Sequence, residues 1–302
     1  MPKKSHPMDV ARTAVSVMGL EDKETTDSSP EANMRKALRI FAKTPTALAA
    51  FYRIRKGKKI IKPKKTLTFA ENFFYMCFGK VPQKEIVKAF DVSLILYAEH
   101  SFNVSTFTAR TITSSLSDIH GAITGAIASL KGPLHGGANE EVMHMMNKIK
   151  KPENALKWIN NALKNKEVVM GFGHRVYKSG DSRVPTMREY FGKVAKIKKD
   201  KKFEKIYDIV EKVMIKEKNI YPNVDYPTGP TYHLMGFDTD FFTPIFVISR
   251  ITGWSAHIME QHAANKLIRP LASYKGNKHR KVMQWTKALI TLKNSRSLTM
   301  RR

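Results

Sequence analysis

Cysteine is almost absent from this chain of 302 residues, which contains only Cys77. A single thiol excludes an internal disulfide framework and a metal site built from several cysteines. No stretch of about 18 uncharged apolar residues is present that could cross a bilayer, and the first residues lack the apolar segment of a secretory signal. We therefore expect a soluble, cytoplasmic protein with no membrane partner.

Acidic residues are scarce relative to basic ones: 26 Asp and Glu stand against 53 Lys and Arg, which gives a formal net charge of +27. This excess predicts anionic partners in general. The densest basic runs, at 53–65 and 193–205, contain few aromatic side chains on which nucleobases could stack. Lysine-rich runs are most often solvated surface. We therefore expect no nucleic-acid partner, and a basic binding protein is an alternative supported by charge alone.

Strand signals are also scarce, whereas apolar residues recur at helical spacing along most of the chain. The run 91–130 has no proline and is rich in small residues, which predicts two closely packed, buried helices. The tetrapeptide Asp27-Ser28-Ser29-Pro30 is a helix-start or loop signal. We predict a mostly α-helical protein, with further helices over 139–148, 152–167, 190–217 and 241–268 and with breaks at 131–133, 135–137, 168–174 and 221–227.

Several common catalytic motifs are missing: the H-E-x-x-H zinc motif, the G-x-S-x-G nucleophile turn, the phosphate-binding P-loop and a complete G-x-G-x-x-G. Histidines, arginines and one aspartate remain beside glycine-rich turns and helix ends: His100, His135, His174, Asp225, Arg175, Arg183, Arg250 and Arg269. Taken one at a time, each has a structural explanation, as a buried histidine, a solvated arginine or a turn aspartate.

Taken together, these residues suit proton abstraction next to a carbonyl group. A carboxylate removes the proton while an imidazole donates a hydrogen bond to the developing enolate oxygen. Arginine side chains bind dicarboxylates through paired hydrogen bonds. No group of histidines and carboxylates has the spacing of a metal site, so we expect neither a metal nor any other cofactor.

The motifs that carry these residues resemble the citrate synthase family. They are GPLHGGANE at 132–140, GFGHRVYKSGDSRVP at 171–185 and YPNVDYPTG at 221–229. The segments at 96–110 and 240–271 also look like this family, and more like its bacterial 2-methylcitrate synthase branch. The resemblance covers roughly residues 5 to 280. It implies a large helical domain, formed by 1–136 with 237–302, and a smaller mobile helical domain, 137–236.

The resemblance also implies an activity and a site. The family condenses an acyl-CoA, here propionyl-CoA or acetyl-CoA, with oxaloacetate to give 2-methylcitrate or citrate and free CoA. By resemblance, Asp225 removes the α-proton, His135 donates to the thioester oxygen, and His174 polarises and protonates the oxaloacetate carbonyl. Oxaloacetate would be bound by His100, Arg183, Arg250 and Arg269, with Arg269 contributed across a homodimer interface. The CoA adenine would lie against the backbone of Val168, Val169, Met170, Gly171 and Phe172.

The sequence also departs from the family pattern. The family usually has a further stretch before the position of His6, which indicates an N-terminally truncated member, and the tail at 283–302 is altered. Two alternatives are therefore cleavage of a citryl-CoA by a related domain and an inactive remnant. Many citrate synthases have a second histidine at the position of Tyr97. The tyrosine at this position resembles the methylcitrate branch. One methylene in an apolar pocket is worth only about 1–3 kcal/mol, so the choice between acetyl-CoA and propionyl-CoA stays open.

Overall fold

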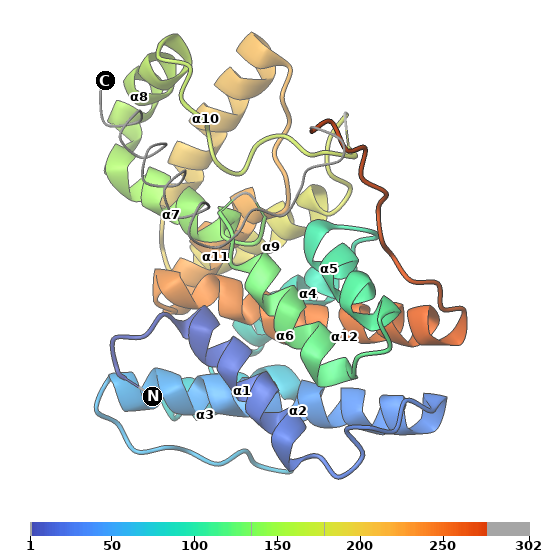
Figure 1. Cartoon of the computed structure of the whole chain (residues 1–302). Coiled ribbons are helices and arrows are strands. Elements are labelled where there is room, and N and C mark those ends of the chain that lie inside the picture. Colours follow the sequence, from blue (N-terminus) through green and yellow to red (C-terminus); the bar gives the residue numbers. More distant parts are fainter. Residues whose placement is uncertain (1, 134, 178, 277–302) are drawn as a thin grey trace, which may run out of the picture. The chain divides into compact units, whose positions relative to one another are not determined.

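The computed structural model describes residues 2–133, 135–177 and 179–276 (Figure 1). The chain divides into two units, Met1–Ile268 and Arg269–Arg302. Within the described part of the first unit the regular structure is helical, apart from one isolated bridge between Phe172 and Pro222. The predicted mostly α-helical fold is therefore confirmed. In the second unit, residues 269–276 form neither helix nor strand, and the altered tail at 283–302 lies outside the described residues.

The described residues of the first unit form twelve α-helices and one short 3₁₀ helix. In chain order they are α1 (Pro7–Glu21), α2 (Pro30–Arg55), α3 (Phe69–Phe78), α4 (Lys84–Tyr97), α5 (Val104–Ser114), α6 (Ile119–Leu130), α7 (Ala138–Ile149), α8 (Pro152–Lys164), α9 (Val184–Ile197), α10 (Lys202–Lys218), α11 (Asp225–Met235), the short 3₁₀ helix η1 (Thr239–Phe241) and α12 (Phe242–Ala263). The helices predicted over 139–148, 152–167 and 241–268 correspond to α7, α8 and α12.

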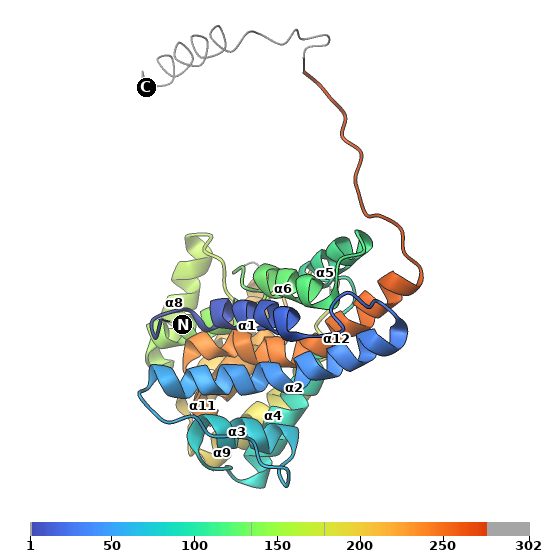
Figure 2. The same ribbon diagram turned by 60° about the horizontal axis from the view of Figure 1, so that its bottom comes forward.

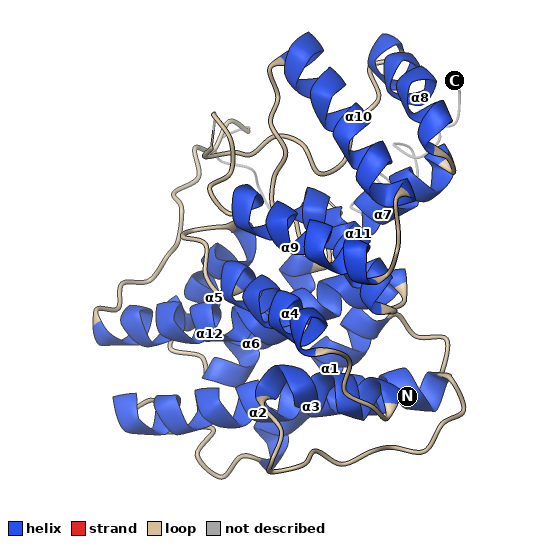
Figure 3. Ribbon diagram, turned by 180° about the vertical axis from the view of Figure 1, so that it is seen from behind, coloured by secondary structure: helices blue, strands red, loops and turns tan. Residues whose placement is uncertain are grey.

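Helix α12 runs through the middle of the first unit, with α2 along one side and α6 along another (Figure 2). Its apolar side chains, such as Trp254 and Ile251, are fully buried. The same hydrophobic core extends to Phe237, whose ring packs against Phe73, Phe74 and Phe90 from α3 and α4. Seen from behind, α8 and α10 pack side by side at the end opposite α2 and α3 (Figure 3).

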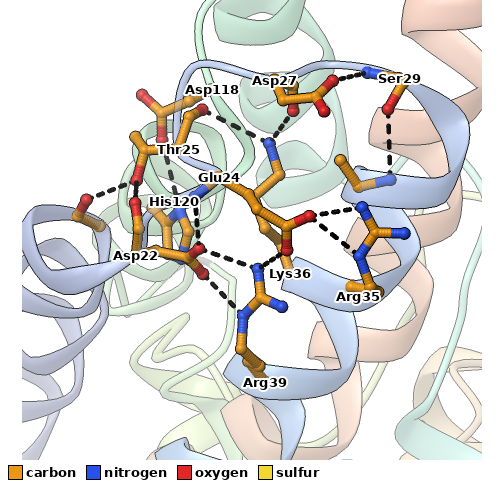
Figure 4. A network of polar contacts seen from close by, with 12 residues as sticks. Asp22, Glu24, Thr25, Asp27, Ser29, Arg35, Lys36, Arg39, Asp118 and His120 are labelled. Carbon is orange, nitrogen blue, oxygen red and sulfur yellow. Dashed lines mark hydrogen bonds and ion pairs between the residues drawn. The ribbon is translucent and has the colours of Figure 1, made fainter.

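The start of α2 follows the predicted signal. Ser29 caps the helix by accepting a hydrogen bond from the Ala32 backbone N–H, and Pro30 occupies the first helical position, where it needs no N–H partner. A polar network holds the preceding turn (Figure 4). In it, Arg39 donates to both Asp22 and Glu24 at 2.7–2.9 Å. This network fixes α1 against α2.

The run 91–130 contains parts of three helices rather than the predicted two. Helix α4 ends at Tyr97, and the helical pattern then restarts twice because polar side chains cap new helices. Asn103 caps α5 by accepting from the Thr106 N–H, and Asp118 caps α6 by accepting from the Gly121 N–H. The predicted close packing is confirmed, since a Cβ at Gly125 of α6 would lie 2.2 Å from the Ile112 side chain of α5.

Two further local predictions were wrong. The segment 190–217 is not one helix, because α9 ends before Lys199, which has φ of 54°, and Asp200 accepts a hydrogen bond from the Phe203 N–H as α10 begins. The segment 221–227 is not wholly a loop, because α11 begins at Asp225. Pro227 falls in the first turn of that helix, where a missing N–H costs no hydrogen bond.

Candidate active site

One cavity of about 540 Å³ gathers the predicted site residues of the first unit. Its walls come from the α4–α5 connection, the turn before α7, the loop at 168–176, the starts of α9 and α11, and α12. The predicted residues that line it are His100, His135, His174, Asp225, Arg183, Arg250, Val168, Val169, Met170, Gly171 and Phe172. Arg175, to which no role was given, lines it too. Arg269 belongs to the second unit, so its role stays a prediction.

His135 is held in one tautomer by Ser105 at the N-terminus of α5. The Ser105 backbone N–H donates to Nε2 of His135 at 3.2 Å, and the Ser105 hydroxyl lies 2.8 Å from the same nitrogen. Because a backbone N–H can only donate, Nε2 carries no proton, and the neutral ring must carry its proton on Nδ1. Burial, with a smaller contribution from the charge of Arg250, lowers the pKa of His135 to about 4. The ring is therefore a neutral hydrogen-bond donor at pH 7.

His174 is fixed in the opposite tautomer. Its Nδ1 accepts hydrogen bonds from the backbone N–H groups of Val176 and Tyr177, both at 3.1 Å, so Nε2 carries the proton of the neutral ring. The ring of His100 lies edge-on to it, with centroids 5.0 Å apart. Burial, followed by the charge of Arg183, lowers the pKa of His100 to about 4. His100, like His135, is therefore neutral at pH 7.

Asp225 is the first residue of α11, rather than a loop residue as predicted. Its backbone N–H donates to the Asn223 side chain at 3.1 Å, and its Oδ1 accepts from the Tyr97 hydroxyl at 2.5 Å. Burial raises the pKa of Asp225 to about 6, while the Tyr97 hydrogen bond and the charge of Arg183 act in the opposite direction. The carboxyl group is therefore a stronger base than an ordinary aspartate and is still ionised at neutral pH.

Arg183 is oriented by Asp181, a residue that the sequence analysis missed. Asp181 is 3% exposed and accepts from the Arg183 backbone N–H, Nε and Nη2 at 3.0, 2.9 and 2.7 Å. Its Oδ2 also accepts from the Val224 N–H at 3.1 Å. Burial acts to raise the pKa of Asp181, but the hydrogen bonds from Arg183 hold it below its ordinary value. One carboxylate therefore joins an arginine of the cavity to the backbone just before Asp225.

Arg250 supplies a second positive charge from α12. It is 1% exposed, and its Nε donates to the Tyr97 carbonyl at 2.6 Å. Its guanidinium carbon lies 4.6 Å from the centre of the Phe246 ring. Burial and the charge of Arg183 lower the pKa of Arg250 to about 10, so the side chain is still charged at pH 7. With Arg183, it gives the cavity the two cations that a dicarboxylate requires.

The loop at 168–173 is tied to the segment that leads into α11. The Asn223 N–H donates to the Gly171 carbonyl at 2.9 Å, and its side chain donates to the Gly173 carbonyl at 3.0 Å. Gly171 has φ of 84°, and a Cβ there would lie 2.6 Å from the Val142 side chain, so only glycine fits without strain. The sequence analysis did not identify Asn223 or Ser105 as site residues, although Asn223 lies in the motif at 221–229 and Ser105 in the segment at 96–110.

Within the described residues, no group of His, Cys, Asp and Glu side chains is arranged to hold a metal ion. None of the described helices combines the length and the apolar character needed to span a bilayer. The acidic and basic side chains that line the cavity are one carboxylate, three imidazoles and the arginines Arg175, Arg183 and Arg250.

Known proteins are similar to this chain in sequence and in fold. Residues 1–271 match a family model described as citrate synthase, C-terminal domain. The chain is 53% identical to a citrate synthase of Mycolicibacterium smegmatis, with 94% of this chain and 76% of that protein covered. It is also 53% identical to a 2-methylcitrate synthase of Mycobacterium tuberculosis, with 93% and 71% covered.

Solved structures of citrate synthases are similar to this chain in fold. A citrate synthase from Thermoplasma acidophilum, described as a ternary complex with carboxymethyl coenzyme A and oxaloacetate, matches with a TM-score of 0.87 and 33% identity, over 95% of this chain and 77% of that one. A citrate synthase from Thermotoga maritima matches with a TM-score of 0.83 and 36% identity, over 95% and 76%. The chain belongs to the citrate synthase family.

Proposed function

We propose that this chain is an acyltransferase that condenses propionyl-CoA or acetyl-CoA with oxaloacetate to give 2-methylcitrate or citrate and free CoA. The observation that carries the proposal is a single cavity lined by a carboxylate with a raised pKa, neutral imidazoles and two largely buried arginines. The relatives described as citrate synthase and as 2-methylcitrate synthase support the same reaction.

In the first step, Asp225 removes a proton from the carbon next to the thioester carbonyl. That carbon is very weakly acidic, so the enol oxygen needs a hydrogen bond at the moment the proton leaves. His135 suits this role because its tautomer leaves an Nδ1–H donor. Because the His135 ring is neutral, its Nδ1 proton can be shared between the ring and the enol oxygen.

In the second step, the enol carbon attacks the ketone carbon of oxaloacetate. The Nε2–H of His174 polarises the ketone oxygen and transfers its proton to it as the new carbon–carbon bond forms. Arg183 and Arg250 offset the two carboxylates of oxaloacetate, and His100 donates a further hydrogen bond. Water then hydrolyses the thioester of the condensed product: the water oxygen bonds to the carbonyl carbon as the carbon–sulfur bond breaks. The proton held by Asp225 restores that of His174, one proton of the water goes to the leaving CoA sulfur, and the other is released from the new carboxyl group, which gives the free tricarboxylate and CoA.

Binding of the CoA moiety and closure of the site complete the proposal. The backbone of Val168–Phe172 offers peptide groups to the adenine, and its attachment to Asn223 links CoA binding to the segment before Asp225. Closure of the 137–236 region over 1–136 with 237–302 would exclude water from the enol. We propose that Arg269 completes the oxaloacetate site of a partner subunit in a homodimer.

A thiol-release assay on the purified chain tests this function, with oxaloacetate and each acyl-CoA donor in turn. We expect CoA release that depends on oxaloacetate. Asp225→Asn should lose most of this turnover but still bind oxaloacetate in a calorimetric titration, because the arginines are intact. Asp91→Asn, a change at a half-exposed residue of α4, is the matched control and should turn over like the unmodified chain. Absence of CoA release with both donors, or normal turnover in Asp225→Asn, contradicts the proposal.

A further inference from the structure

A buried tyrosine contacts the proposed base directly. Tyr97 is the last residue of α4 and is 1% exposed. Its hydroxyl donates to Oδ1 of Asp225 at 2.5 Å. Among the residues that the structure describes, this is the only hydrogen bond to that carboxylate, so Oδ2 is left for a substrate. In the reaction proposed above, Tyr97 has no step of its own.

The ring and the backbone of Tyr97 are both fixed by contacts with α12. Its ring packs against Phe246 of α12 with centroids 4.2 Å apart, and its carbonyl accepts from Nε of Arg250 at 2.6 Å. The next carbonyl, that of Ala98, accepts from the Gly253 N–H at 3.0 Å. A side chain fixed by packing and backbone hydrogen bonds presents its hydroxyl in one direction without further ordering.

We propose that Tyr97 is a positioning residue for the reaction: its hydroxyl fixes Asp225 in the orientation of a base and favours the ionised carboxylate. The inference rests on the proposed function, because it assigns Asp225 the role of base. It also connects the two halves of the site, since Arg250, which is proposed to bind oxaloacetate, holds the backbone of the residue that orients the base.

The other charged and titratable groups near Asp225 come from three directions. Arg183 and Asp181 approach from the start of α9, Arg250 from α12, and Tyr232 from α11 itself. Asp181 disfavours the ionised carboxylate, whereas the two arginines favour it, and burial is the largest opposing effect. Among the described residues, the Tyr97 hydroxyl is the one neutral side chain that donates to the Asp225 carboxylate. Burial raises the pKa of Tyr97 well above its ordinary value, so the hydroxyl remains protonated and able to donate.

Replacing Tyr97 by phenylalanine removes the hydroxyl and keeps the ring contact with Phe246. We expect the acid limb of the pH profiles of kcat and kcat/KM to move upward by about one pH unit, because the ionised form of Asp225 loses its hydrogen bond. The KM for oxaloacetate, measured above the limb, should stay the same. Tyr232→Phe is the matched control: it removes another fully buried hydroxyl, which contacts Ser93 at 2.9 Å, and should leave the acid limb unmoved.

Infrared difference spectroscopy tests the inference without using activity. The band lost in Asp225→Asn reports the carboxyl group of Asp225, and its titration midpoint should be higher in Tyr97→Phe than in the unmodified chain. Uniform 3-fluorotyrosine labelling makes each tyrosine a stronger donor while preserving its shape, and it should lower that midpoint even if the phenylalanine variant does not fold. If neither change moves the midpoint, the inference is wrong. If the midpoint moves but the chain releases no CoA, the positioning role stands and the proposed function fails.

Discussion

Replacement of Asp181 by asparagine is the change whose effect can be worked out most fully from the structure. The carboxylate accepts four hydrogen bonds, and all four donors are N–H groups of Arg183 or Val224. An asparagine side chain has one oxygen and one NH₂ group. Whichever way the amide is turned, its NH₂ faces two of these donors, so two of the four hydrogen bonds are lost.

The size of the effect follows from burial. The side chain of Asp181 is 0% exposed and that of Arg183 is 13% exposed, so the remaining guanidinium cannot recover its hydration. Removing one partner of such a buried pair costs about 3–5 kcal/mol of folding free energy. The variant should also show a raised KM for oxaloacetate and a reduced kcat, since Arg183 loses its orientation and the backbone before Asp225 loses an anchor.

Urea unfolding at fixed protein concentration measures the loss of stability, and thiol release measures the kinetic change. Asp208→Asn is the matched control, because Asp208 pairs with Arg188 at 2.8 Å but is 58% exposed. Such a surface pair contributes about 0–1 kcal/mol. If Asp181→Asn lost no more stability than this control and kept its KM for oxaloacetate, the assignment of Asp181 as the anchor of Arg183 would be refuted.

Two further predictions concern the base and the subunit interface. Activity should fall as the pH drops through about 6, since only the ionised form of Asp225 accepts a proton. The pKa values of His100 and His135 lie near 4, so these two imidazoles do not contribute to that limb. A limb near pH 4 in a pH–rate series would show that Asp225 has an ordinary pKa. If Arg269 acts across the dimer, Arg269→Ala should weaken oxaloacetate binding, and mixing it with inactive Asp225→Asn chains should restore some turnover. No recovery in the mixture would count against a shared site.

Much of the cavity could be predicted because its residues stand at breaks in helical pattern. His135 and His174 each follow or precede glycines that interrupt apolar periodicity, and Asp225 stands between two prolines. These local signals do not depend on how the helices pack. The lining of one cavity by all three residues shows that the breaks mark the ends of helices that converge there.

The residues that orient the site were harder to predict, because their partners are distant in sequence. Ser105 contacts His135 across 30 positions, and Asp181 reaches Val224 across 43. Neither contact can be deduced from periodicity, since each depends on the packing of whole helices. The break between α9 and α10 was missed for a different reason: it lies in a lysine-rich run without glycine or proline, and the turn depends on Lys199 adopting a positive φ of 54°.

The most direct test of the central claim is a crystal structure of the chain with oxaloacetate and carboxymethyl coenzyme A, an unreactive analogue of the acyl donor. The account predicts that the carboxymethyl group accepts a hydrogen bond from Nδ1 of His135 and shares a proton with the Asp225 carboxyl group, facing an oxaloacetate held by Arg183 and Arg250. A complex in which Asp225 points away from the analogue, or in which His135 contacts it through no donor, would contradict the account.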